Sequence, residues 1–261
     1  MSRWFIRSVG IAAPGLAGWH ASRGILRGEV PYAAVAETPY APALLPPNER
    51  RRATASVRQA FRAAEDAVNV AGVDARELAS VFASSDADMA VLHRICAALA
   101  QTSRAISPTD FHNSVHNAAS GYWSIAMQNT ALTTTLSAFD ASFTAGLLEA
   151  AALVDAQRDV LLVVYDAVAP PPLQAKRPLA LPAGVAVVLS ARAGSAPLGQ
   201  IAIAASDAPE SSCANPALEA LRMANPALRA LPLFELLAAQ RAATVNLRGS
   251  GDACVALSYA P

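Results

Sequence analysis

The apolar run DVLLVVYDAV, residues 159–168, limits the fold of this chain more than any other segment. Its unbroken hydrophobicity is typical of a β-strand that other layers cover on both faces. Before it, strand-like and helical segments alternate along the chain. These predicted segments are a strand at 4–13, a helix at 48–72, a short strand within 77–85, a helix at 86–101, a strand ending at 137 or 138, and a helix at 142–157. The alternation predicts a layered α/β domain with a largely buried sheet.

Local signals mark the ends of these segments. Asn48 is predicted to cap the first long helix and Gly72 to end it, while Asp86 or Asp88 lies near the start of the next helix. The stretch 23–47 is rich in proline and alanine and is expected to be irregular.

The pattern changes after the proline-rich segment APPPLQAKRPLALPAG, residues 169–184. GVAVVLSAR and GQIAIAAS predict two strands of a hairpin or meander. Short helical pieces interrupted by prolines follow, and then a turn with Gly249 and Gly251 leads into a final strand.

Composition excludes several classes of function. The 20 basic and 20 acidic side chains balance, so nothing indicates a nucleic-acid partner or a membrane surface. The three cysteines have no metal-ligand spacing, and the longest apolar region contains Glu149 and Asp155, so it is not a membrane span. The N-terminus lacks the apolar stretch of a signal peptide. We expect a cytoplasmic protein without a metal or cofactor.

The stretch TTTLSAFDASFTAGLLEAA, residues 133–151, predicts a strand, a sharp turn and a helix with small side chains. Many enzymes place a nucleophile at such a turn, but here the turn carries Asp140. One interpretation is an aspartate that caps the helix, where N–H groups and the helix dipole favour negative charge. A general base is the other, although no histidine follows His116 to serve as proton partner. A triad of Ser114, His116 and Asp140 lacks a nucleophile-elbow motif.

The segment FHNSVHNAASGYW, residues 111–123, is unusually rich in histidine and aromatic residues. His112 and His116 lie four residues apart, but without a third ligand they are expected to satisfy backbone groups in a loop rather than to bind metal. Phe111, Tyr122 and Trp123 indicate either a contact surface or tunnel lining, or core packing.

These motifs together resemble the β-ketoacyl synthase family, the condensing enzymes of fatty-acid and polyketide assembly, which have the thiolase fold. FIRSVGIAAPGLAG is similar to the opening strand and turn of the family, and Asn117 and Gly121 match its asparagine-rich segment. Counted from Gly121, Asp140 falls at the position of the nucleophilic cysteine, and Phe143 replaces a usual glycine. The match covers roughly residues 1–165.

The resemblance weakens in the second half of the chain. Family members carry two histidines there, whereas residues 191–244 are too short for that half and contain none. The resemblance therefore implies a thiolase-like layered α-β-α fold in one domain, 1–261. Its N-terminal half, 1–168, is complete, and its C-terminal half, 169–261, is strongly shortened. Without the cysteine and histidines, chain elongation by this polypeptide alone is chemically implausible.

Within the family the chain resembles a non-catalytic chain length factor, of the short type found in aryl polyene biosynthesis clusters. The resemblance implies that the strand at 132–138 pairs across a two-fold axis and that side chains of this chain limit the acyl tunnel of the other subunit. The implied partners are a full-length ketosynthase, an acyl carrier protein and a growing acyl or polyene chain. The basic cluster at 48–52 is either a solvated face or a docking site for the acidic carrier.

Ten residues are predicted at the tunnel or dimer interface: Phe111, His116, Asn117, Tyr122, Trp123, Met127, Leu136, Phe139, Ser142 and Phe143. Asp140 is predicted to be a helix-terminal anion or a plug, and in either case to find N–H groups or a cation, since a buried unpaired carboxylate costs several kcal/mol. Two alternatives stay open. Asp140 could act as base in an acyl-carrier thioester decarboxylase or hydrolase, or the chain could form a homodimeric scaffold without chemistry.

Overall fold

A single mixed β-sheet forms the centre of the computed structural model, which describes residues 3–194, 196–251 and 253–261. The strand order is β4-β3-β5-β6-β1-β7-β9-β8, and β2 pairs with the end of β1. The strands are β1 Arg3–Ala13, β2 Leu16–Ala17, β3 Ala79–Ala83, β4 Thr133–Leu136, β5 Val160–Asp166, β6 Ala183–Ser190, β7 Gly199–Ser206, β8 Ala243–Arg248 and β9 Cys254–Ala260. β3, β4 and β5 run parallel, and the other neighbours pair antiparallel.

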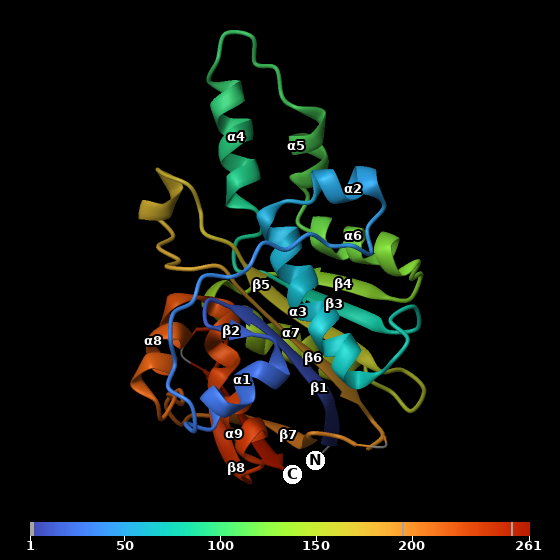
Figure 1. Cartoon of the computed structure of the whole chain (residues 1–261), viewed down its shortest axis with the longest axis vertical. Coiled ribbons are helices and arrows are strands. Elements are labelled where there is room, and N and C mark those ends of the chain that lie inside the picture. The colour runs from blue at the N-terminus through green and yellow to red at the C-terminus, as the bar shows by residue number, and fades with distance from the viewer. Residues whose placement is uncertain (1–2, 195, 252) are drawn as a thin grey trace.

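Helices cover both faces of this sheet (Figure 1). α3 and α6 pack on one face, against β1, β3, β5 and β6, and α7 packs on the other face, against β3 and β5. The α-helices are α1 Trp19–Leu26, α2 Pro47–Arg52, α3 Ala55–Ala71, α4 Met89–Leu99, α5 Pro108–Asn113, α6 Ala118–Met127, α7 Ser142–Leu153, α8 Pro216–Ala224 and α9 Leu231–Ala239. Short 3-10 helices are η1 Phe139–Ala141, η2 Leu173–Ala175 and η3 Pro226–Ala230. The predicted α-β-α layering is confirmed.

The central strands are covered on both faces, as the apolar run at 159–168 predicts. Every residue of β5 is buried. Phe82, Leu161 and Val163 face the α3–α6 side, whereas Val81 and Leu162 face the α7 side, so successive side chains supply two separate cores.

Small residues allow α3 to lie close to the sheet. Ala60, Ala63, Ala64 and Ala67 form its fully buried stripe. A Cβ at Gly10 of β1 would lie 2.1 Å from the carbonyl oxygen of Ala63, a distance that no side chain can accept. The abundance of alanine therefore reflects close packing between helix and sheet.

The start of α3 differs from its prediction. Asn48 lies within the separate short helix α2, and the cap of α3 is Thr54, whose Oγ1 accepts a hydrogen bond from the N–H of Val57 at 3.3 Å. The predicted end at Gly72 is confirmed, because Gly72 adopts the left-handed conformation with φ of 60°. Asp88 caps α4 as one of the two predicted candidates.

The two strands predicted at 184–192 and 199–206 are present as β6 and β7, but the prediction that they form a hairpin or meander is wrong. β6 and β7 do not pair with each other, because β1 lies between them and pairs antiparallel with both. α1 and β8 were not predicted. The boundary at residue 168 stays a prediction, and the sheet continues across it, since β6 pairs with both β5 and β1.

A helical arm, defined here as residues 89–113, extends from the β4 end of the molecule (Figure 1). It consists of α4, α5 and their connection. Val91 is the only buried residue of α4, although Leu92 and Leu99 are large apolar side chains that point to solvent. No helix in the described part of the chain is long and apolar enough to cross a membrane.

Candidate functional site at the strand-to-helix turn

The predicted sharp turn connects β4 to α7 through η1. Phe139 adopts φ of 52°, a left-handed conformation that is uncommon for a residue other than glycine. Ser142 holds the turn together, because its Oγ accepts a hydrogen bond from the N–H of Ala138 at 3.1 Å and donates one to the carbonyl of Phe139 at 2.7 Å. Neither η1 nor α7 has a side-chain cap hydrogen bond, so the helix-capping interpretation of Asp140 is not confirmed.

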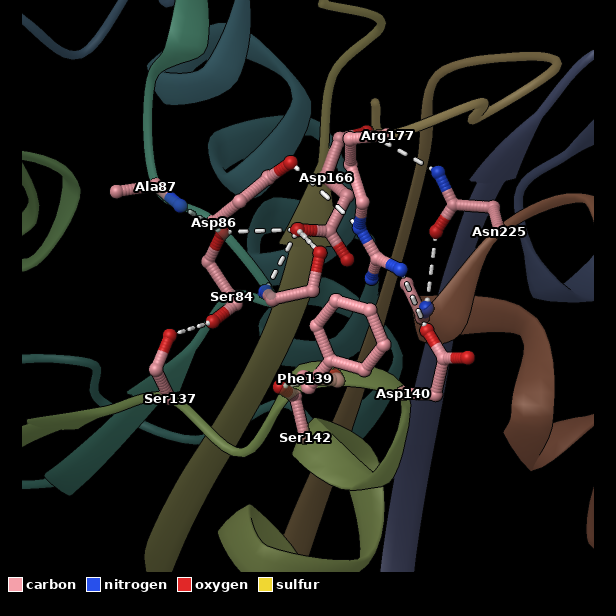
Figure 2. A network of polar contacts seen from close by, with 12 residues as sticks. Ser84, Asp86, Ala87, Ser137, Phe139, Asp140, Ser142, Asp166, Arg177 and Asn225 are labelled. Atoms are coloured by element: carbon pink, nitrogen blue, oxygen red, sulfur yellow. Dashed lines mark hydrogen bonds and ion pairs between the residues drawn. The ribbon is translucent and has the colours of Figure 1, made fainter. Parts of the chain in front are cut away.

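Asp140 pairs with a cation from a distant segment. Its Oδ1 lies 2.8 Å from Nη1 of Arg177, and its side chain is 25% exposed (Figure 2). No backbone N–H in the described residues donates to this carboxylate. The prediction that Asp140 would find a compensating group is confirmed, and the compensation comes from the guanidinium rather than from the helix terminus.

Arg177 contacts two further groups around the turn. Its guanidinium carbon lies 3.8 Å from the centre of the Phe139 ring, a cation–π arrangement. Its Nε lies 3.7 Å from Oδ2 of Asp86, at the carboxyl end of β3. Arg177 belongs to the proline-rich segment between β5 and β6, yet its side chain is only 11% exposed.

A fully buried carboxyl group lies behind this pair. Oδ1 of Asp166, at the end of β5, accepts hydrogen bonds from the hydroxyls of Ser84 and Ser85 and from the N–H of Ser85. Burial raises the pKa of Asp166 to about 7, and the charge of Asp86 adds to the increase. Burial also raises the pKa of Asp86, against the effect of Arg177.

Sequence reasoning missed both Asp166 and Arg177 as parts of this site. A signal existed for Asp166: it ends the apolar run, and Ser84-Ser85-Asp86 ends the neighbouring strand, so both lie at the same edge of the parallel part of the sheet. No local pattern in the proline-rich segment distinguishes Arg177.

The triad of Ser114, His116 and Asp140 is not formed. The hydroxyl of Ser114 donates to the carbonyl of Phe111 at 2.8 Å, and Nε2 of His116 lies 3.1 Å from Oγ of Ser137. Burial lowers the pKa of His116, which favours the neutral imidazole. The described residues contain no cluster of histidine, cysteine or carboxylate side chains able to hold a metal ion.

No cysteine sits at the turn. Cys96 is exposed on α4, whereas Cys213 and Cys254 are buried elsewhere. The turn therefore carries an ion-paired carboxylate and no thiol.

The ten predicted tunnel or interface residues divide by exposure. The exposed ones are Phe111, Asn117 and Phe139, the half-buried ones are His116, Met127 and Leu136, and the buried ones are Tyr122, Trp123, Ser142 and Phe143. The ring of Trp123 lies 5.2 Å from that of Phe61, edge to face, so for Tyr122 and Trp123 the core alternative holds. Phe143, on α7, is likewise buried in the hydrophobic core.

An open edge and exposed apolar side chains accompany the turn. β4 ends the sheet, so one side of its backbone has no neighbouring strand. Large exposed apolar side chains lie on the helical arm, on and before α6, and near both ends of β4; in Figure 1 the arm extends above α6 and β4. They are Leu92, Leu99, Phe111, Val115, Ile125, Leu132 and Phe139. The unpaired edge of β4 is a template on which another chain can pair.

Comparisons with known proteins bear on this geometry. The family model described as β-ketoacyl synthase, N-terminal domain, matches residues 26–248. No curated protein matches the chain.

Solved structures provide the fold comparison. One chain of the ketosynthase ApeO in complex with its chain length factor ApeC, from Xenorhabdus doucetiae, is 22% identical with a TM-score of 0.73 over 98% of both chains. A β-ketoacyl synthase from Burkholderia phymatum is 12% identical with a TM-score of 0.72 over 100% of this chain and 99% of that one. The ishigamide ketosynthase/chain length factor is 13% identical with a TM-score of 0.73 over 99% of both chains. The predicted thiolase-like fold is confirmed.

Proposed function

This chain belongs to the β-ketoacyl synthase N-terminal domain family, and from that premise we propose that it is a non-catalytic chain length factor. In this role it forms a heterodimer with a full-length ketosynthase and contributes one wall of that enzyme's acyl tunnel. The observation that carries the proposal is the ion pair of Asp140 and Arg177, at the turn where the family resemblance places a nucleophilic cysteine.

The absence of a second reactive group supports the same conclusion. No histidine follows His116 in the sequence, and His116 itself is hydrogen-bonded to Ser137 rather than to Asp140. Decarboxylation or hydrolysis by Asp140 would require a proton donor within hydrogen-bond reach, or through one water. Arg177 is a poor donor because its guanidinium stays protonated. The geometry therefore favours a shape-giving role over the thioester hydrolase or decarboxylase alternative.

The open edge of β4 supplies a means of assembly. A partner strand can pair with β4 and extend the sheet across the interface. Phe139, which is 61% exposed, and Leu132 lie beside the two ends of β4, and the helical arm adds further apolar area. Burial of this surface is worth about 25 cal/mol per Å² of apolar area.

We propose polyketide assembly of the aryl polyene type as the pathway, with an acyl carrier protein and the growing chain as further partners. The fold similarity to a chain of the ApeO–ApeC complex supports this choice, together with the sequence resemblance. A cytoplasmic location belongs to the same proposal.

Co-expression tests the proposal. The chain is produced together with a full-length ketosynthase, and the mass of the purified species is measured by light scattering during gel filtration. A one-to-one heterodimer is expected. A monomer in the presence of that ketosynthase contradicts the proposal, and a stable homodimer that excludes the ketosynthase supports the scaffold alternative instead.

A further inference from the structure

The segment between β5 and β6, residues 167–182, lies beside the turn and is tied to it by one side chain. Apart from η2, the segment is irregular and largely exposed, and Lys176 and Pro178 point to solvent. Arg177 between them does the opposite, since its side chain is only 11% exposed. A guanidinium that is buried in this way needs a paired carboxylate, and its ion pair with Asp140 ties the loop to the turn.

Arg177 joins three parts of the structure at one point (Figure 2). It pairs with Asp140 of the turn at 2.8 Å, it lies 3.7 Å from Asp86 at the end of β3, and it stacks at 3.8 Å on the ring of Phe139. The other buried arginine near Asp140 is Arg229, which lies 3.6 Å from Glu210. Arg177 is therefore the cation that serves both carboxylates of the turn region.

The ring of Phe139 contacts Arg177, yet the residue stays 61% exposed. Its backbone has the left-handed φ of 52°, and such a conformation in a residue other than glycine persists where the surroundings hold it. Arg177 supplies that hold, because it covers the ring and fixes the neighbouring carboxylate at the same time. Phe139 follows β4 in the chain, and its exposed surface is available to a partner.

We infer that Arg177 is a positioning residue that clamps segment 167–182 onto the turn and presents Phe139 to the partner subunit in one orientation. The clamp also closes the approach to Asp140 from the side of this segment. An aromatic anchor that is ordered before binding loses less conformational freedom on association than a mobile one. The clamp itself is a property of the free chain, whereas the presentation of Phe139 rests on the proposed function.

The free chain offers an unusually clean test of the clamp. Lys176 is the only lysine in the sequence, so a lysine-specific protease has a single site, and that site lies beside Arg177. Release of the clamp increases the population of open segment and hence the cleavage rate. Three variants test the clamp. Asp140→Ala removes the carboxylate that pairs with Arg177, and Asp140→Glu restores a carboxylate at the same position. Asp155→Asn is the control, because it breaks an exposed ion pair with Arg158 elsewhere on the surface.

We expect Asp140→Ala to be cut roughly tenfold faster than the wild type, and Asp140→Glu and Asp155→Asn to be cut at rates close to wild type. Circular dichroism confirms that each variant keeps its fold before digestion. A wild-type cleavage rate in folded Asp140→Ala overturns the clamp. Rescue by glutamate distinguishes the ion pair from a merely structural effect of the substitution.

A second measurement concerns the partner. The affinity for the ketosynthase is measured for Arg177→Ala, Phe139→Ala and the double variant. If Arg177 acts through Phe139, the double variant binds no more weakly than Phe139→Ala alone, whereas independent, additive losses overturn the positioning role. If the wild-type chain binds no ketosynthase, the proposed function fails, and the protease measurement alone then decides on the clamp.

Discussion

Ser85 donates two hydrogen bonds to the same carboxyl oxygen of Asp166, from its backbone N–H at 2.7 Å and from its hydroxyl at 2.9 Å. These bonds join the carboxyl ends of β3 and β5 directly behind the turn. The second oxygen, Oδ2, is buried and has no hydrogen-bond partner among the described residues. A carboxyl group that is satisfied on one oxygen only, and shielded from water, favours the protonated form.

This arrangement predicts a pH dependence of stability. Burial raises the pKa of Asp166 to about 7, compared with about 3.9 in an unfolded chain. The stabilisation that follows from this raised pKa is fully present below about 3.9, the pKa of the group in the unfolded chain. Between these two values the unfolded state releases its proton first, so the free energy of unfolding falls as pH rises and levels off above about 7. The predicted loss is of the order of a few kcal/mol.

Urea unfolding between pH 4.5 and 8 measures this effect. Asp166→Asn keeps an oxygen for the serine donors and cannot ionise, so its stability is expected to decline less over this range than that of the wild type. Parallel pH profiles for the two proteins would contradict the account of Asp166.

Trp123 and Phe111 are predicted to behave in opposite ways. Trp123 is buried against Phe61 and Phe82, so Trp123→Ala is expected to lower the free energy of unfolding by about 3–5 kcal/mol. Phe111 is 69% exposed on the helical arm, so Phe111→Ala is expected to change stability by less than about 0.5 kcal/mol but to weaken binding to the ketosynthase. Chemical denaturation and binding titrations of both variants check this, and a large stability loss in Phe111→Ala contradicts it.

The open edge of β4 gives a backbone prediction. The backbone N–H groups of Ser80 and Ser84 donate to the carbonyls of Leu132 and Leu136. Because backbone groups alternate in direction along a strand, those of Thr135 point away from β3. Thr135→Pro removes an outward N–H without removing a bond to β3. Thr135→Val is the matched control, because both variants lose the hydroxyl that contacts Ser120. We expect the proline variant alone to bind the ketosynthase at least about tenfold more weakly, which corresponds to the loss of one hydrogen bond or more. Equal affinities of the two variants would exclude strand pairing at β4.

Restoring a thiol at the turn is predicted to be insufficient for catalysis. Asp140→Cys replaces the carboxylate with a candidate nucleophile but leaves no histidine after His116 to activate a thioester. It also leaves Arg177 without its main counter-ion. We expect no condensation by the isolated variant, measured as release of carbon dioxide from a malonyl-carrier thioester. Turnover above that of the wild-type chain would contradict the assignment.

The sequence predictions were correct where local signals determine the structure and failed where contacts between distant segments determine it. β5, the end of α3 at Gly72 and the turn before α7 depend on local signals, and all three were predicted correctly. The pairing of β6 and β7 was not, because β1 enters the sheet between them from the other end of the chain. Sequence neighbours make a hairpin plausible, but only tertiary packing decides strand order.

The candidate site shows the same limit. The residues of the turn itself could be recognised from the motif around Asp140. Its counter-ion, Arg177, comes from a proline-rich segment with no periodicity, and the hydrogen-bonding of Asp166 joins residues more than 80 positions apart. The sequence predicted that Asp140 would find N–H groups or a cation, but it did not identify Arg177 as that cation.

The most direct test of the central claim compares condensation by three preparations: this chain alone, its ketosynthase alone, and the two mixed at equal concentrations. Carbon–carbon bond formation from malonyl-carrier substrate and the length of the products are measured by mass spectrometry. The account predicts no product from this chain alone and, from the mixture, products whose lengths differ from those of the ketosynthase alone. Condensation by the isolated chain, or identical product lengths with and without it, would contradict the claim.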